Sequence, residues 1–152
     1  MRNLAILGST GSIGSSTLDV VKSNPGMFDI QLLAAKSNHP LLLEQIKLFK
    51  PNFIYLEDES SFISIKDAIK DIDQSLEVIN NEQDLLSLIS SNIIDTVVAA
   101  VVGIAGLNGV EAALSSGKRV LLANKEKTML LYVPIVIGKA CGKIRVRTRC
   151  PT

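Results

Sequence analysis

The sequence contains no tryptophan, and phenylalanine and tyrosine together make up only 4% of its residues. An aliphatic core of this kind is typical of parallel α/β sheets, whose buried strands are rich in valine, isoleucine and leucine. The only cysteines are Cys141 and Cys150. Two cysteines provide neither a disulfide framework nor a metal-ligand spacing. We therefore expect a protein of the reducing cytoplasm.

Long hydrophobic runs are also missing. No stretch approaches the roughly 18 uncharged apolar residues that a membrane span needs, and the first residues lack the apolar region of a secretory signal. We therefore expect neither a membrane span nor a leader. A chain of 152 residues, of which 47% are hydrophobic and 20% charged, can form one globular domain with a core of its own.

Acidic residues are absent after Glu126. Residues 1–126 contain ten Lys or Arg and fifteen Asp or Glu, a net charge of −5, whereas residues 127–152 contain six bases and no acid, a net charge of +6. Such a break indicates either a basic tail with a partner or a segment that was not shaped together with the rest. One aromatic residue and a short basic end argue against a nucleic-acid-binding arm.

Strand-like and helical patterns alternate along the chain. Apolar runs predict strands over residues 4–7, 28–35, 53–56, 76–79, 93–102 and 119–123, and helical spacing predicts helices over residues 12–24, 41–49, 60–72, 83–90 and 106–116. We expect Ser12 to be the N-cap of the first helix and Gly117 to end the last one. This alternation predicts a Rossmann-like, doubly wound and mostly parallel α/β sheet with helices on both faces.

Three glycines, Gly8, Gly11 and Gly14, lie between the first strand and the first helix. Gly8 can adopt a positive φ, Gly11 would let the backbone approach a pyrophosphate, and Gly14 would let the helix pack closely on the strand. The N–H groups that begin a helix attract anions. The spacing is G-x-x-G-x-x-G, a variant of the dinucleotide fingerprint. A glycine-rich turn without a ligand is the alternative interpretation.

The end of the second predicted strand indicates which dinucleotide is bound. NAD sites usually place an acidic residue there, whereas NADP sites place cations and hydroxyls that hold the 2′-phosphate. Lys36, Ser37 and Asn38 follow this strand, and none is acidic. The sequence therefore favours NADP, although Lys36 could also be an ordinary solvated lysine. His39, the only histidine, is interpreted as an exposed loop residue.

Two further loops follow predicted strands, at the edge of the sheet where α/β proteins bind ligands. Residues 103–106 (GIAG) could allow close approach of a nicotinamide or ribose, or could simply shape a turn. Asn124, Lys125 and Glu126 combine an amide, a cation and an acceptor, which indicates either a site or a solvated loop.

Two segments, LAILGSTGSIGSSTLDVV (residues 4–21) and VVAAVVGIAGLNGVEAALSSGKRVLLANKE (residues 97–126), resemble the NADPH-binding domain of 1-deoxy-D-xylulose 5-phosphate reductoisomerase. The resemblance covers about residues 3–126. It implies that the cofactor phosphates are held by Thr10, Gly11, Ser12 and Ile13, and that the 2′-phosphate loop is formed by Lys36, Ser37 and Asn38. It also implies further cofactor contacts from Asn124 and Glu126. Lys125 would contact the substrate. Lys36 and Ser37 stand in the reverse of the family's usual order of small residue and cation.

The resemblance also implies an activity. Members isomerise a phosphosugar substrate and reduce it with NADPH to 2-C-methyl-D-erythritol 4-phosphate, in the non-mevalonate pathway of isoprenoid biosynthesis. They use a divalent metal, Mg or Mn, as homodimers.

After Glu126 the sequence departs from the family and contains no carboxylate for that metal. We therefore expect an NADPH-binding domain over residues 1–126, and an atypical basic tail over residues 127–152 in place of the start of the catalytic domain. On this hypothesis the chain is a truncated reductoisomerase with a frame-shifted or foreign ending, inactive alone, with no catalytic or metal-binding residues of its own. The alternatives are a non-catalytic NADP(H)-binding module and a fragment of another small Rossmann-type NADP oxidoreductase.

Overall fold

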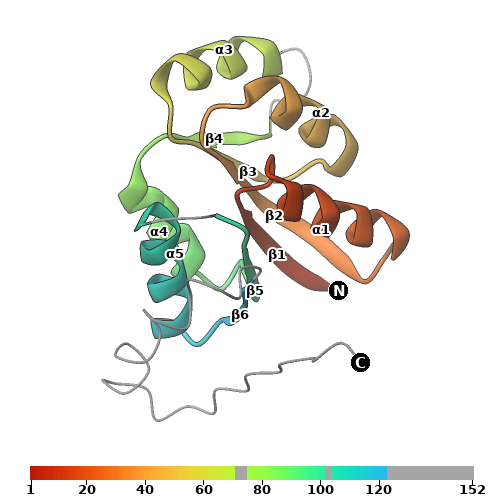
Figure 1. Ribbon diagram of the computed structural model, residues 1–152, viewed down its shortest axis with the longest axis vertical. Helices are drawn as coiled ribbons and strands as arrows, with labels where there is room; N and C mark the ends of the chain where they lie inside the picture. The colour runs from red at the N-terminus through yellow and green to blue at the C-terminus, as the bar shows by residue number, and fades with distance from the viewer. Residues whose placement is uncertain (71–74, 102–103, 123–152) are drawn as a thin grey trace.

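The computed structural model describes residues 1–70, 75–101 and 104–122, in which strands and helices alternate (Figure 1). The strands are β1 (Arg2–Leu7), β2 (Phe28–Ala35), β3 (Phe53–Leu56), β4 (Glu77–Ile79), β5 (Thr96–Ala99) and β6 (Arg119–Leu122). The helices are α1 (Ser12–Ser23), α2 (His39–Phe49), α3 (Glu59–Ile69), α4 (Glu82–Ser90) and α5 (Ile104–Ser115).

The strands form one parallel sheet in the order β4-β3-β2-β1-β5-β6. The predicted doubly wound α/β fold is thus confirmed. The chain runs outward from β1 to β4 and then returns to β5 on the other side of β1, so the strand order reverses between β1 and β5. In sheets of this kind ligands bind beyond the carboxyl ends of the strands at that point.

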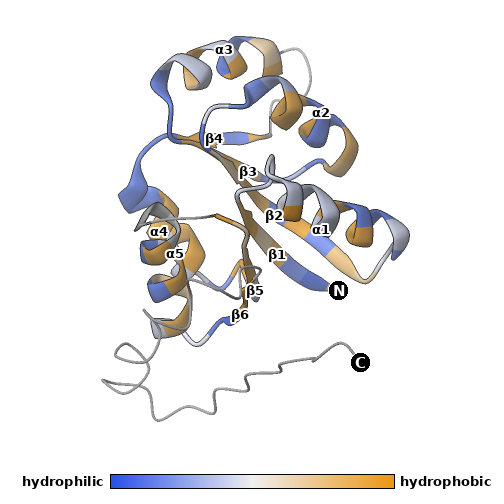
Figure 2. Cartoon of the chain, in the orientation of Figure 1, coloured by the Kyte–Doolittle hydropathy of each residue, from blue (hydrophilic) through white to orange (hydrophobic). Residues whose placement is uncertain are grey.

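Helices cover both faces of the sheet because the side chains of each strand alternate between them. Leu4 and Ile6 belong to the core cluster formed with α1, α2 and α3, whereas Ala5 and Leu7 belong to the cluster formed with α4 and α5. Figure 2 shows β1 changing from hydrophilic at its first residues to hydrophobic along the rest of its length. The carboxyl end of β1 is therefore fixed between two packed layers.

Two strands have the predicted bounds at both ends, whereas most other elements begin or end at a different residue than the sequence predicts. The strands over residues 28–35 and 53–56 have the predicted bounds, and Gly117 ends α5 as expected, with a φ of 74°. The prediction for Ser12 was wrong by one residue, because Ser12 is the first helical residue and Gly11 is the N-cap. Residues 104–106 form the first turn of α5 rather than a loop.

The strand predicted over residues 93–102 is only four residues long in the structure. Ile93 lies in a turn and is 41% exposed, whereas Ile94 is fully buried without belonging to a strand. The apolar run therefore correctly predicted that residues near β5 are buried. It was wrong as a sign of extended structure because a buried residue can also lie in the connection that leads into a strand.

Candidate dinucleotide-binding site

The turn after β1 requires glycine at its first position. Gly8 has a φ of +85°, as the sequence predicts, and a Cβ there would lie 3.0 Å from the carbonyl oxygen of Ala100, just after β5. The N–H groups of Gly8 and Ser9 both donate to the Ala34 carbonyl of β2, at 2.8 and 2.9 Å. The turn is therefore held between the carboxyl ends of β2 and β5.

Gly14 in the first turn of α1 allows the helix to lie directly on this turn. A Cβ on Gly14 would lie 2.2 Å from the Gly8 carbonyl oxygen and 2.6 Å from the Ser9 Cα, distances that no packed structure tolerates. A Cβ on Gly11 would lie 3.5 Å from the same oxygen, which is ordinary van der Waals contact. Packing thus explains Gly8 and Gly14 but leaves Gly11 without a packing reason.

The N-terminus of α1 presents backbone donors at the carboxyl edge of the sheet. The first N–H that bonds to the cap belongs to Ser15, which donates to the Gly11 carbonyl at 2.9 Å, and Gly11 has no side chain to cap the turn. Within the described part of the chain, the N–H groups of Ser12, Ile13 and Gly14 find no acceptor. The first turn also contains no acidic residue. These free donors and the helix dipole fit a phosphate group.

The loop after β2 exposes the three residues predicted to hold a 2′-phosphate. Lys36, Ser37 and Asn38 are all exposed. Their backbone is held from α3, because the Asp58 N–H donates to the Lys36 carbonyl at 3.0 Å and the Ser61 hydroxyl donates to the Ser37 carbonyl at 2.9 Å. With these carbonyls bonded, the loop leaves the Lys36 and Ser37 side chains available to a ligand.

Asn38 has a structural role that the sequence analysis did not predict. Its Oδ1 accepts a hydrogen bond from the Leu41 N–H at 3.3 Å and caps α2. Only its Nδ2 group remains for a ligand. His39 is the first residue of α2 and is only half-exposed, and within the described structure its buried Nδ1 atom has no hydrogen-bond partner.

Asp58 places a negative charge beside this loop. Its Oδ2 accepts from the Ser60 hydroxyl at 2.6 Å and from the Ser61 N–H at 2.8 Å. These hydrogen bonds lower the pKa of Asp58 to about 2, so the carboxylate is ionised at neutral pH and caps α3. An acidic residue just before a helical run is a recognisable N-cap signal, which the sequence analysis overlooked.

Gln45 is a second contact to the glycine turn that the sequence analysis missed. Its side chain lies on α2, is buried, and donates from Nε2 to the Ser9 carbonyl at 2.9 Å. Thirty-six residues separate the two partners. No local pattern could have indicated this contact.

Several predicted residues lie outside the described part of the chain. They are Gly103, Asn124, Lys125, Glu126 and the whole of residues 127–152. Leu122 ends β6, and it is paired in register with Ala99 at the end of β5. The described chain therefore stops at the same edge of the sheet as the glycine turn.

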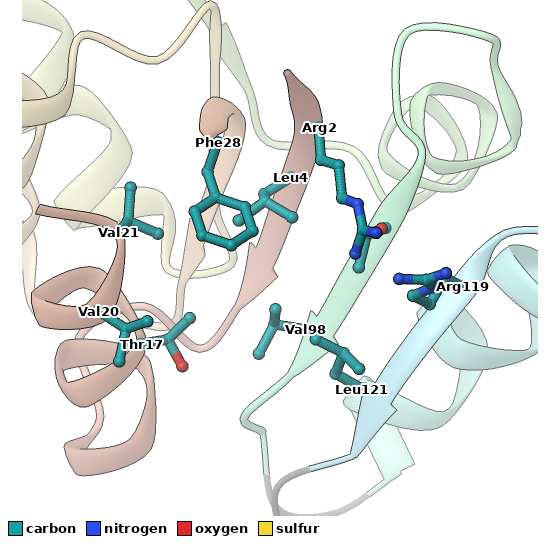
Figure 3. A pocket seen from close by; sticks show the side chains of 10 residues that line it. Arg2, Leu4, Thr17, Val20, Val21, Phe28, Val98, Arg119 and Leu121 are labelled. Carbon is teal, nitrogen blue, oxygen red and sulfur yellow. The ribbon is translucent and has the colours of Figure 1, made fainter. Parts of the chain in front are cut away.

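A cavity of about 210 Å³ lies elsewhere, between α1 and residues of β1, β2, β5 and β6 (Figure 3). Figure 3 shows Val98 of β5 and Leu121 of β6 on one side of it and Thr17 of α1 on the other. Arg2 and Arg119, both at strand starts, line the end away from the glycine turn. This cavity is therefore separate from the candidate dinucleotide site.

No group of three or more His, Cys, Asp or Glu that could hold a metal ion occurs among the described residues. In the same part of the chain, every helix is too short or too polar to cross a membrane.

Sequence comparison with known proteins identifies a family for this chain. The sequence profile of the 1-deoxy-D-xylulose 5-phosphate reductoisomerase family matches residues 4–131. The reductoisomerase of Saccharophagus degradans is 44% identical over 130 residues, which are 86% of this chain and 33% of that protein. The chloroplastic enzyme of Mentha piperita is 42% identical over 137 residues, which are 90% of this chain and 29% of that protein.

Solved structures give the same result. A DOX-P reductoisomerase in complex with NADPH, fosmidomycin and magnesium superposes with a TM-score of 0.81 at 34% identity, covering 90% of this chain and 33% of that one. The Zymomonas mobilis enzyme in complex with NADPH has a TM-score of 0.78 at 31% identity, covering 89% of this chain and 35% of that one. The chain thus spans about a third of the length of the relatives it matches. It belongs to the 1-deoxy-D-xylulose 5-phosphate reductoisomerase family and corresponds to the N-terminal region of its members.

Proposed function

We propose that this chain is the NADPH-binding part of a 1-deoxy-D-xylulose 5-phosphate reductoisomerase. The observation that supports this most strongly is the start of α1, where three N–H groups without acceptors among the described residues follow a turn that only glycine can form. A dinucleotide pyrophosphate is the anion that Rossmann-like folds bind at this position. Related proteins of the family were solved in complex with NADPH.

The cofactor would lie along the carboxyl edge of the sheet. Ser12 and Ile13 hold its pyrophosphate through backbone N–H groups, and Thr10 and Ser12 add their hydroxyls. Gly11, whose own N–H donates to the Gly8 carbonyl, lets the phosphate approach the backbone. Lys36 and Ser37 contact the 2′-phosphate, and Asn38 contributes its Nδ2 while its oxygen caps α2. When bound, NADPH supplies the hydride for the reduction that the family catalyses.

The remaining contacts are proposed for residues that the structure does not describe. Asn124 and Glu126 contact the cofactor, and Lys125 contacts the phosphosugar substrate. The divalent metal of the family would supply Lewis-acid polarisation of the substrate. No acidic residue follows Glu126 in this sequence. We therefore expect residues 1–152 alone to bind NADPH without converting substrate. A homodimer and a cytoplasmic location complete the proposal, although plant relatives are chloroplastic.

A fluorescence titration with NADPH tests the binding proposal. We expect saturable binding with a dissociation constant below about 1 mM, because several charge-assisted hydrogen bonds contribute. The variant Gly11→Asp should abolish binding while the protein stays folded. Its carboxylate would cap α1 favourably but would occupy and repel the phosphate position. Unchanged binding by Gly11→Asp would place the cofactor elsewhere on the molecule.

The preference for NADPH over NADH tests the second loop separately. Lys36→Ala should weaken NADPH binding about tenfold and NADH binding much less, because only NADPH carries the 2′-phosphate. Lys22→Ala, in the last turn of α1, is the matched control and should change neither affinity. Equal losses for both cofactors in Lys36→Ala would contradict the proposed role of this loop.

A turnover assay distinguishes half an enzyme from a complete one. With 1-deoxy-D-xylulose 5-phosphate, NADPH and Mg²⁺ or Mn²⁺, we expect no substrate-dependent oxidation of NADPH by residues 1–152. NADPH binding without turnover also describes the alternative function, a non-catalytic NADP(H)-binding module. The coding DNA after the Glu126 codon separates the two, because a downstream family sequence in another frame would identify a truncated reductoisomerase.

A further inference from the structure

Gln45 makes an unusual contact from the middle of α2. Its side chain is only 6% exposed, and its Nε2 donates to the Ser9 carbonyl oxygen at 2.9 Å. Ser9 itself is completely buried and lies against the face of α1 that Gly14 leaves open. The glycine turn is therefore fixed from two sides, by α1 through close packing and by α2 through this hydrogen bond.

The contact acts on the peptide group next to the proposed phosphate site. The Ser9 carbonyl belongs to the peptide that ends in the Thr10 N–H, and the following residues begin α1. Gln45 thereby fixes the orientation of this peptide, and with it the direction of the Thr10 N–H. An N–H group binds an anion only when the N–H bond points at that anion. The orientation of the peptides in the turn therefore affects how strongly the turn binds a phosphate.

The Gln45 amide is bonded through only one of its two polar groups. Within the described structure, Gln45 Oε1 is buried and has no hydrogen-bond partner. An apolar side chain would avoid the free-energy cost of that unpaired oxygen but would leave the buried Ser9 carbonyl without this donor. The benefit of the amide therefore comes from what its Nε2 group does to Ser9.

The same helix also holds the second half of the site. Asn38, in the proposed 2′-phosphate loop, caps α2 through the Leu41 N–H, and Gln45 lies farther along the same helix. One rigid element thus connects the 2′-phosphate loop to the pyrophosphate turn.

We propose that Gln45 is a positioning residue for the dinucleotide, which sets the glycine turn through the Ser9 carbonyl. This inference rests on the proposed function. It adds a residue that acts on the cofactor only through the glycine turn and does not itself touch the cofactor.

The test compares two buried glutamines. Gln45→Met removes the donor at nearly constant volume. Gln31→Met is the matched control: Gln31 is 5% exposed and bonded to Asp29 and Asn52 near the start of β2, away from the carboxyl edge. We expect Gln45→Met to raise the NADPH dissociation constant roughly threefold to tenfold, and Gln31→Met to leave it unchanged. Gln45→Asn, which keeps the amide but is too short to reach Ser9, replaces Gln45→Met if that variant does not fold.

Amide hydrogen exchange without nucleotide provides a readout that is independent of the proposed function. The exchange of the Ser9 and Gly11 amides, bonded to Ala34 and Gly8, should be faster in Gln45→Met and unchanged in Gln31→Met after correction for global stability. If both variants weaken NADPH binding equally, or if exchange at Ser9 and Gly11 is unchanged in Gln45→Met, the inference is overturned. If the wild-type chain does not bind NADPH, the proposed function fails, and the exchange rates alone decide whether Gln45 orders the turn.

Discussion

At the scale of single residues, the three glycines of the turn have different physical roles. Gly8 provides a positive φ, and Gly14 provides space against the Gly8 carbonyl oxygen. Gly11 has an ordinary backbone, and a side chain there would meet only a normal contact. The motif therefore combines two structural requirements with one position that remains free for ligand approach.

Alanine substitutions separate these roles. Gly14→Ala should lower the free energy of unfolding by roughly 2–4 kcal/mol, because its Cβ would collide with backbone atoms that cannot move without displacing α1. Gly11→Ala should cost only about 0.5–1 kcal/mol, the loss expected when alanine replaces glycine at an N-cap. Urea unfolding of both variants measures the difference. Equal losses would mean that α1 is free to shift on the turn.

At the scale of elements, the loops of the site are organised by helix caps. Asn38 caps α2 and Asp58 caps α3, and hydrogen bonds from the Asp58 N–H and the Ser61 hydroxyl hold the loop after β2. Among α1 to α4, whose N-caps the structure describes, α1 is the exception, since Gly11 has no side chain to satisfy the first N–H groups. This is the helix proposed to bind the pyrophosphate.

The Asp58 cap predicts a pH dependence of stability. Its pKa is lowered from 3.8 to about 2 by hydrogen bonds from Ser60 and Ser61. A carboxyl whose pKa is lower in the folded state stabilises the protein above its unfolded pKa, and this contribution is lost as the pH falls through the folded value. Asp58→Asn removes the titration, so its destabilisation relative to wild type should shrink between pH 4 and pH 2.

Urea unfolding at pH 7, 4 and 2.5 measures this difference. A constant difference between wild type and Asp58→Asn across the three pH values would contradict the assigned hydrogen bonds.

At the scale of the whole molecule, the helices of the described region cover the two faces of the sheet unequally. α1, α2 and α3 pack on one face over β1 to β4, and α4 and α5 pack on the other. Among the helices of residues 1–70, 75–101 and 104–122, only α1, α2 and α3 contribute to the core cluster on this face (Figure 1). Val20 and Leu121, which line the cavity there, are 56% and 50% exposed.

At this scale we also predict how residues 127–152 affect the solubility of the protein. Their sequence includes an uncharged apolar run over residues 130–137, interrupted only by Pro134, and such runs promote aggregation when they find no partner. We expect deletion of residues 127–152 to raise the soluble fraction after expression. Sedimentation and light scattering of the two proteins at equal concentration measure this. Lower solubility after deletion would mean instead that the segment packs on the folded part.

Local sequence patterns determined the fold, the bounds of two strands and the position of the glycine turn. The bounds of β2 and β3 could be predicted because polar, glycine or proline residues stand within two residues of each end of their apolar runs. The order of strands and helices, combined with the general rules of parallel sheets, was enough for the fold. The glycine turn was recognisable because backbone conformation and close packing restrict the residue type at single positions.

The tertiary structure alone decided the contacts between distant residues. The length of β5 depended on where Ile94 is buried, and burial is a property of the packed molecule. Gln45 could not be assigned because its partner lies 36 residues away, and the cap formed by Asn38 depended on where α2 begins. Hydrophobic spacing specifies which face of an element is buried, whereas the pairing of polar groups depends on which elements meet once the sheet has assembled.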